Sequence, residues 1–350
     1  MKNDEPTGYI RACPERMAVR FCVRLLAIAL ALALPTALLA AEAQQTKRIA
    51  FLCPTSCSNL PNPISPEDQA FLRGLASSVH ARNVYFDMAG AGVGDTRLSE
   101  MASRLVSRKV DVIVAVGNMA ARAAREATRR VPIVMLDVAD PVDEGLIASL
   151  GRPGGNVTGL AVPYEQLAAK HVELLREVRP GLTRVAMLWN PQIALHKRRL
   201  AHIEAAIRPL GVELLPVEAA TVRDLEKAFA SVSTGRADGL MVPEYLASRA
   251  GWGWGRGEIA MFALAHRLPT IAASGEFVAA SGLMSYGPDL RDVYERAGGY
   301  AAKILAGVRP SELPVEEPTR FVLTISRITA KAVGLTIPQS LLLRADQVIE

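Results

Sequence analysis

The sequence predicts an α/β fold made of two Rossmann-like domains, each with a doubly wound parallel sheet. Apolar strand-like runs alternate with helical stretches from residue 48 onward. Two of the runs, Val110–Val116 and Pro132–Val138, are almost wholly apolar, as is typical of parallel strands buried on both faces. The alternation restarts after the loop-forming stretch Gly151–Gly159 (GRPGGNVTG). Two successive series of strands and helices therefore predict two such domains.

Local patterns define the elements of the first series. Ser65 stands where a helix N-cap is expected, with Pro66 in the first turn. Ala102, Leu105 and Val106 recur at the spacing of an apolar helix face. We expect strands at 48–53, 84–88, 110–116, 132–138 and 156–161, and helices at 66–80, 95–108, 118–128 and 142–150.

The second series begins with a helix after the glycine-rich joint. Gly211 is placed to end one helix in a left-handed conformation. Four glycines in Gly251–Gly257 weaken another helix start, and its two tryptophans suit a mobile lid, a docking segment or an ordinary surface loop. We expect strands at 184–189, 212–217, 239–242, 269–272 and 320–325, and helices at 164–178, 193–210, 222–233, 257–266 and 290–306.

Residues 1–43 have the pattern of a secretory signal peptide. An almost wholly apolar run, Leu25–Ala40, precedes the small-residue site Ala41-Glu42-Ala43. The run is interrupted by Pro35 and is shorter than the roughly 20 residues of a spanning helix. We therefore predict cleavage near Ala43 and a periplasmic location, with an uncleaved N-terminal anchor as the alternative. The basic residues that begin this segment are Arg11, Arg16, Arg20 and Arg24.

Composition indicates a folded, exported protein rather than a nucleic-acid-binding one. Half of the residues are apolar and 5% are aromatic, so the core is built from Ala, Val, Leu and Ile. The net charge of +5 is spread along the chain without interleaved aromatic residues, which argues against nucleic acid as a partner. Cys53 and Cys57 are close enough to form a disulfide in an oxidising compartment, and otherwise remain two isolated thiols.

The sequence contains no recognisable catalytic or cofactor motif. The stretch Gly90–Gly94 (GAGVG) lacks the last glycine of the dinucleotide-binding loop and follows the second strand instead of the first. We therefore expect no cofactor, no metal and no enzymatic activity, although a catalytic triad assembled from distant residues keeps a secreted hydrolase as an alternative. The scattered histidines are interpreted as helix-surface residues: His80, His171, His196, His202 and His266.

Polar residues that follow the strands are the candidates for ligand binding, because ligands of open α/β sheets bind beyond the carboxyl ends of the strands. Asn118, at a helix N-terminus, suits an anionic group, and Asp140 suits an ammonium group or caps a helix. Trp189 suits stacking on a flat ligand or packing in the core. The other candidates at strand ends are Ser56, Asp137, Asn190, Glu244 and Ser274.

Several segments, in the same order along the chain, resemble ABC transporter substrate-binding proteins of the branch that includes aromatic amino-acid binders. They include Val110–Gly117, Ile133–Pro141, Gly151–Leu160, Val185–Pro191, Gly282–Pro288, Leu313–Pro318 and the tail Ala330–Glu350. The resemblance implies a type I periplasmic-binding fold, with two lobes joined by a hinge. It implies that lobe one spans 44–160 plus 274–310 and that lobe two spans 161–273 plus 311–350.

The same resemblance implies a set of ligand contacts and a function. The contacts are Asn118, Asp140, Asn190, Glu244 and Tyr286, of which Tyr286 alternatively fills the hinge. The implied function is that of the periplasmic solute-binding component of an ABC uptake transporter. We expect a monomer that binds a small polar ligand, an amino acid or related organic acid, by hinge closure and delivers it to a membrane permease. A sensory binding protein that docks on a membrane receptor is a further alternative.

Overall fold

A computed structural model describes residues 46–54, 65–78, 84–90, 95–192, 194–243, 246 and 255–350. The expected signal peptide, Ser56, Cys57, Glu244 and most of the segment with two tryptophans lie outside the described residues. In the part of the chain that is described, no helix is both long enough and apolar enough to cross a membrane.

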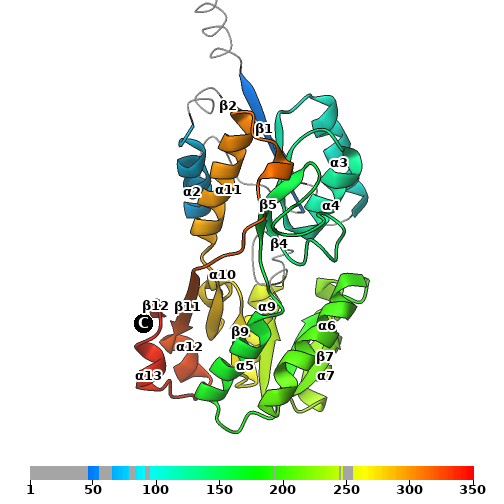
Figure 1. Ribbon diagram of the computed structural model, residues 1–350. Helices are drawn as coiled ribbons and strands as arrows, with labels where there is room; N and C mark the ends of the chain where they lie inside the picture. The colour runs from blue at the N-terminus through cyan, green and yellow to red at the C-terminus, as the bar shows by residue number, and fades with distance from the viewer. Residues whose placement is uncertain are drawn as a thin grey trace, which may run out of the picture. The chain divides into compact units, whose positions relative to one another are not determined.

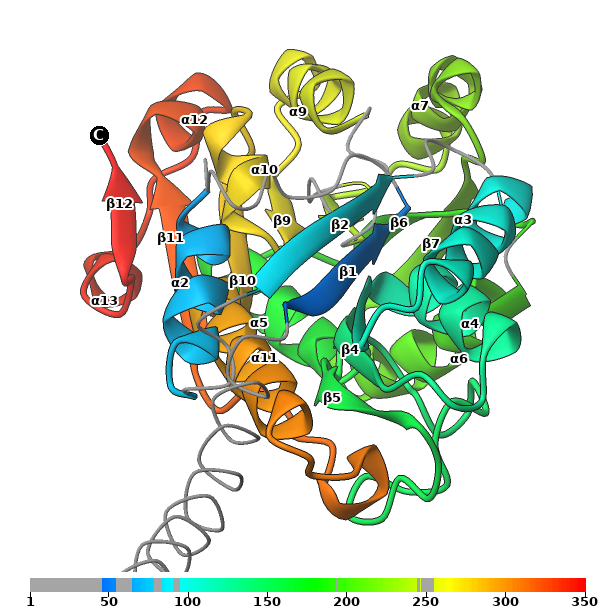
Figure 2. The same cartoon turned by 90° about the horizontal axis from the view of Figure 1, so that it is seen from above.

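The first sheet has five parallel strands in the order β2-β1-β3-β4-β5. Both of its faces are covered, since α2 and α11 pack on one face and α3 and α4 on the other (Figures 1 and 2). The elements are β1 (Lys47–Cys53), α2 (Pro66–Leu75), β2 (Val84–Gly90), α3 (Asp95–Ser107), β3 (Val112–Val116), α4 (Gly117–Ala127), β4 (Ile133–Val138), β5 (Val157–Ala161), α11 (Leu290–Leu305) and the 3₁₀ turn η4 (Pro310–Glu312). We call this unit lobe one.

The second sheet has seven strands in the order β12-β11-β10-β9-β8-β6-β7, and only the β10–β11 pair is antiparallel. Helices again cover both faces. Its elements are α5 (Leu167–Val178), β6 (Arg184–Trp189), α6 (Ala194–Ile207), η2 (Arg208–Leu210), β7 (Glu213–Glu218), η3 (Val222–Asp224), α7 (Leu225–Thr234), β8 (Gly239–Val242), α9 (Arg256–Ala265), β9 (Thr270–Ala272), α10 (Gly275–Ala279), β10 (Met284–Pro288), β11 (Phe321–Ser326), α12 (Arg327–Ala332), α13 (Gln339–Leu342) and β12 (Gln347–Ile349). We call this unit lobe two.

Three chain crossings join the lobes, and two of them lie elsewhere than the sequence suggested. The stretch 274–288, expected in lobe one, belongs to lobe two because β10 pairs with β9 and β11. The stretch 311–316, expected in lobe two, stays with lobe one. There Leu313 and Val315 are buried in the two cores of lobe one, and Glu316 forms a parallel bridge with Leu160. The crossings therefore follow β5, follow β10 and precede β11.

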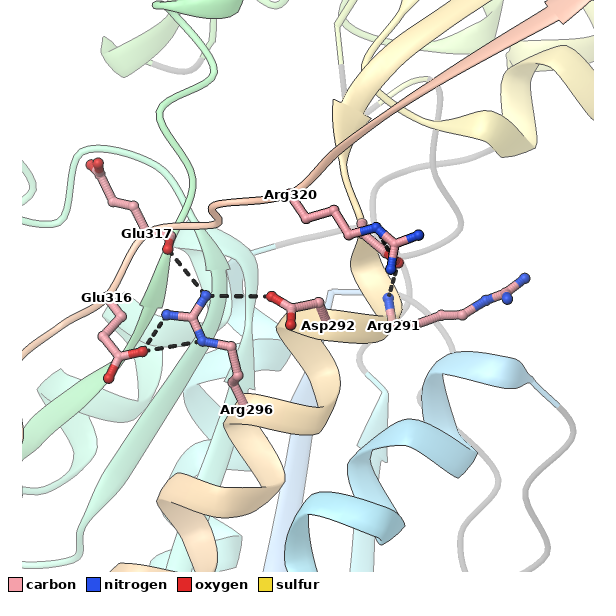
Figure 3. A network of polar contacts seen from close by, with 7 residues as sticks. Arg291, Asp292, Arg296, Glu316, Glu317 and Arg320 are labelled. Atoms are coloured by element: carbon pink, nitrogen blue, oxygen red, sulfur yellow. Dashed lines mark hydrogen bonds and ion pairs between the residues drawn. The ribbon is translucent and has the colours of Figure 1, made fainter. Parts of the chain in front are cut away.

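A polar network on α11 holds the third crossing against lobe one (Figure 3). The Arg296 guanidinium donates to the Glu316 carboxylate, to the Glu317 carbonyl at 3.1 Å and to Asp292 at 3.4 Å. The second and third crossings are also joined, since Asp289 N–H donates to the Arg320 carbonyl at 3.0 Å and its carboxylate pairs with Arg320 at 3.4 Å.

The expectation of a helix at 142–150 is wrong. Residues 141–145 form successive turns, in which Glu144 N–H donates to the Asp140 carbonyl and Gly145 N–H to the Val142 carbonyl. Gly145 has φ +66°, a left-handed conformation that ends any helical path there. The consequence is a compact acidic turn directly after β4.

Candidate functional site

A cavity of about 50 Å³ lies at the carboxyl ends of β6 and β8, between α5 and α6. That volume has room for roughly four water molecules, at the 10–15 Å³ that each water requires. Its wall combines apolar side chains with a few polar ones. The main lining residues are Tyr164, Glu165, Ala168, His171, Met187, Trp189, His196, Arg199, Ile203, Met241 and Pro243.

Arg199 is the central charged group of the cavity. It projects from α6 and is 8% exposed. Its Nε lies 3.1 Å from Glu165 Oε1 and 3.7 Å from Asp140 Oδ2. A buried guanidinium is tolerated only with such carboxylate partners. Because Asp140 follows β4 of lobe one, this contact connects the two lobes.

The acidic turn after β4 faces α6 at a second point. Arg198 pairs with Glu144 at 3.9 Å, and the Glu144 side chain is almost wholly buried. Neighbouring arginines of α6 thus contact carboxylates at both ends of the turn 140–144.

The backbone around Asp137 and Asp140 is strained. Both residues have positive φ, +58° and +47°. Asn118 fixes the loop, since its Oδ1 accepts from Ala139 N–H at 3.0 Å and its Nδ2 donates to the Ala139 carbonyl at 2.6 Å. Asp137 in turn accepts a hydrogen bond from the Tyr164 hydroxyl. Strained backbone of this kind is concentrated at ligand-binding sites, and the Asn118 amide serves to shape the loop.

Asn190 builds the turn that follows β6. It is fully buried, and its Oδ1 accepts from Gln192 N–H at 2.9 Å. Its backbone N–H donates to His196 Nδ1 at 3.2 Å. Two buried donors here, Asn190 Nδ2 and Trp189 Nε1, have no hydrogen-bond acceptor among the described residues. The turn thereby places Trp189 and His196 in the cavity wall.

Two histidines expected on helix surfaces, His171 and His196, are instead buried. Burial, with a smaller contribution from the Arg199 charge, lowers the pKa of His196 to about 3. Burial also lowers the pKa of His171 to about 4, although its hydrogen bond to the Tyr286 carbonyl at 2.6 Å opposes that shift. Both rings are therefore neutral at physiological pH.

Two further candidates from the sequence do not line the cavity. Tyr286 stacks on Phe321 with ring centres 5.7 Å apart, and its ring is nearly perpendicular to that of His171, with ring centres 6.4 Å apart. Ser274 caps α10, accepting from Glu276 N–H at 3.3 Å. Asp140 and Asp137 are not part of the cavity wall, but they contact the wall residues Arg199 and Tyr164. Cys53 is disulfide-bonded, and its expected partner lies outside the described residues.

The sequence analysis missed the residues that helices contribute, above all Arg199. A signal was present, because buried positions on α6 recur as His196, Arg199, Ile203 and Ile207. This spacing follows one helix face, so an arginine occurs where the pattern calls for an apolar residue. Among the described residues, no cluster of three or more His, Cys, Asp or Glu side chains is arranged to hold a metal ion.

Two doubly wound lobes, linked by three crossings, define a type I periplasmic binding protein, and solved structures support this class. A protein from Vibrio cholerae O1 biovar El Tor superposes with a TM-score of 0.76 at 25% identity, covering 87% of this chain and all of that one. A domain from Streptococcus pneumoniae, solved in complex with L-Trp, superposes with a TM-score of 0.77 at 22% identity over the same shares.

The chain belongs to the ABC transporter substrate binding protein family, whose model matches residues 69–349. A curated relative, the tyrosine-binding protein of Clostridioides difficile strain R20291, is 27% identical over 255 residues. The match covers 72% of this chain and 71% of the relative. The resemblance noted from the sequence is therefore confirmed at the level of the family.

Proposed function

We propose that this protein is the exported solute-binding component of an ABC uptake transporter and that its ligand is an amino acid. The observation that carries the proposal is the buried guanidinium of Arg199, set between carboxylates of both lobes and beside Trp189. Opposite charges next to an aromatic ring suit a zwitterion with an apolar side chain. Two relatives support the same ligand class: one is named a tyrosine-binding protein, and the other was solved in complex with L-Trp.

In the proposed complex each charged group of the ligand has a partner. Asp140 and Asp137 receive the ammonium group, and Arg199 receives the carboxylate in a charge-assisted hydrogen bond. The ligand side chain lies against Trp189 and the apolar wall formed by Met187, Met241 and Ile203. Glu165 remains with Arg199 and keeps its charge balanced.

The small cavity supports a hinge motion. A volume for roughly four waters is less than an amino acid requires. The lobes must therefore separate at the contacts of α6 with the acidic turn, Arg199–Asp140 and Arg198–Glu144, before a ligand can enter. Closure around the ligand would then present both lobes to a permease, a motion typical of hinged binding proteins.

Calorimetric titration of the purified protein with the common amino acids tests the proposal. Arg199→Gln should weaken binding of the best ligand by about 10- to 100-fold, the effect of one lost hydrogen bond to a charged group. Lys197→Gln is the matched control, because it removes a neighbouring basic residue of α6 that is exposed and lies outside the cavity wall. We expect it to change affinity by less than about threefold. Unchanged affinity in Arg199→Gln, or the absence of any amino-acid ligand, would contradict the proposal.

A further inference from the structure

Basic residues precede adjacent strands at the amino edge of the lobe-one sheet. Lys47-Arg48 begin β1, Arg108-Lys109 come shortly before β3, and Arg129-Arg130 come shortly before β4. These strands are neighbours in the sheet. Their starts are in register, because Asp111 N–H donates to the Arg48 carbonyl and Ile113 N–H to the Pro132 carbonyl. A charge that is dispersed in the sequence is thus gathered along one edge.

The turn that carries Arg129 and Arg130 is held firmly. Thr128 Oγ1 accepts from Arg130 N–H and Val131 N–H, each at 3.1 Å. Asn156, just before β5, donates from Nδ2 to the carbonyls of Thr128 and Val131 at 3.2 and 2.7 Å. The basic side chains therefore project from a fixed backbone, and Arg152 adds one more just upstream of β5.

Part of this charge is balanced and part is not. Lys47 pairs with Asp111 at 3.9 Å, while Arg48 and Arg108 share Asp87 at 2.9 and 2.7 Å. The remaining four basic residues are exposed and pair with no carboxylate in the described parts of the chain. They are Lys109, Arg129, Arg130 and Arg152. We call these four residues the basic edge.

The corresponding edge of lobe two is only partly balanced, because Arg236 and Arg267, shortly before β8 and β9, are exposed and pair with no carboxylate among the described residues. Arg184, which begins β6, pairs with Glu213, and Arg179 pairs with Asp238 at 3.6 Å. The uncompensated charge is therefore greater on lobe one, where four such residues lie at the edge, than on lobe two, where Arg236 and Arg267 do.

We propose that the basic edge is a docking surface for anionic phospholipid headgroups. The chain enters lobe one at this same edge, since β1 begins at Lys47 and the apolar run Leu25–Ala40 ends seven residues earlier. Seven residues span at most about 25 Å. Whenever the apolar segment lies in a bilayer, during export or as a retained anchor, the start of β1 at this edge is held within that distance of the lipid surface. Basic clusters beside a membrane segment bind anionic lipid, and each residue strengthens binding by about fivefold.

Sedimentation with lipid vesicles tests this docking surface. The protein is residues 44–350, whose part from Lys47 onward forms a compact unit by itself. The vesicles contain either phosphatidylcholine alone or phosphatidylcholine with about 30% phosphatidylglycerol. We expect binding only to the anionic vesicles, and a steep decrease when NaCl is raised from about 50 to about 300 mM.

Two variants, each with four substitutions, test whether binding depends on the basic edge or only on the net positive charge of the protein. Lys109→Gln/Arg129→Gln/Arg130→Gln/Arg152→Gln should weaken binding to the anionic vesicles by about 100-fold or more. The matched control replaces four exposed basic residues of lobe two, Arg223→Gln/Lys227→Gln/Arg236→Gln/Arg267→Gln, and should change binding by less than about threefold. Circular dichroism and thermal melts check that both variants fold. Equal losses in the two variants, equal binding to neutral vesicles, or binding to acidic proteins without binding to anionic vesicles would overturn the proposal.

Discussion

Two adjacent glycines of α11 should respond in opposite directions when changed to alanine. α11 packs against α2 in lobe one, and the two helices meet at Gly298. A Cβ added there would lie 2.1 Å from the Phe71 carbonyl oxygen and 2.8 Å from Leu75 N. At Gly299, one residue along, an added Cβ has nothing within 4 Å. The pair therefore separates helix propensity from helix packing.

The expected magnitudes follow from that geometry. Alanine is favoured over glycine in a helix interior by about 1 kcal/mol, so Gly299→Ala should raise the free energy of unfolding by about that amount. Gly298→Ala gains the same propensity but forces α2 and α11 apart, because backbone atoms cannot rotate away from the new methyl group. Overpacking of this kind costs up to about 3 kcal/mol. We expect a net loss of about 2 kcal/mol, and hence a difference of about 3 kcal/mol between the variants.

Urea unfolding followed by far-ultraviolet circular dichroism measures both variants. Circular dichroism is preferred to tryptophan fluorescence, because the substitutions are in lobe one whereas Trp189 lies in lobe two. Comparable slopes against urea concentration would show that the unfolding transition itself is unchanged. If Gly298→Ala proved as stable as Gly299→Ala, the close approach of the two helices would be refuted.

Three further predictions follow from the described residues. Between pH 7 and 5, His171 and His196 become protonated in the unfolded chain but stay neutral in the folded protein, where their pKa values are about 4 and about 3. The free energy of unfolding should then fall by about 2 kcal/mol per histidine, and a His→Gln change that still folds should remove its share in melts at the two pH values. Gly159→Ala, at φ +131° with an added Cβ 2.1 Å from the Met135 carbonyl oxygen, should cost at least about 2 kcal/mol in urea unfolding. Gly117→Ala, at φ +78° in open space, should cost only about 1 kcal/mol, and equal losses would refute the clash. Arg296→Met should lower the melting temperature by about 2–4 °C through the loss of its partly exposed bonds to Glu316, and a melt identical to wild type would show that this network adds nothing.

The sequence predicted buried strands well and short elements poorly. β3 and β4 were evident because strands covered on both faces are apolar throughout their length. β10 (Met284–Pro288) and β12 (Gln347–Ile349) were missed, because serine, glycine and proline interrupt the first and the second is largely exposed. The equally short β8 and β9 were found, since both are buried throughout. Sheet membership was harder still. Nothing local in residues 274–288 says which lobe they join, because pairing with β9 and β11 decides it.

For the candidate site, the search of the strand ends identified residues of the loops around the cavity but missed Arg199, its central charged residue. Asp137 and Trp189 lie at the carboxyl ends of β4 and β6, Asp140 follows β4, and Asn118 was recognised at the start of α4. Its role was not, because the bonds to Ala139 depend on the path of a strained loop.

The two carboxylates beside Arg199 differ in a way that bears on ligand exchange. Glu165 belongs to the start of lobe two and lies closer, at 3.1 Å, and in our proposal it moves with α6 when the lobes separate. Asp140 belongs to lobe one and lies at 3.7 Å, so the opening that we propose would take this carboxylate away from the guanidinium while Glu165 stays beside it. In our proposal a ligand carboxylate then supplies the second negative charge, while Asp140 becomes available for the ligand ammonium. The ligand thus exchanges one interlobe ion pair for two contacts of the same type. Its affinity is the difference between those contacts and the ion pair it replaces. Asp140→Asn should consequently weaken the closed state without ligand as well as the binding of an amino acid. Scattering profiles recorded with and without ligand would show both effects as a larger radius of gyration, and a variant that stayed as compact as wild type would contradict this account.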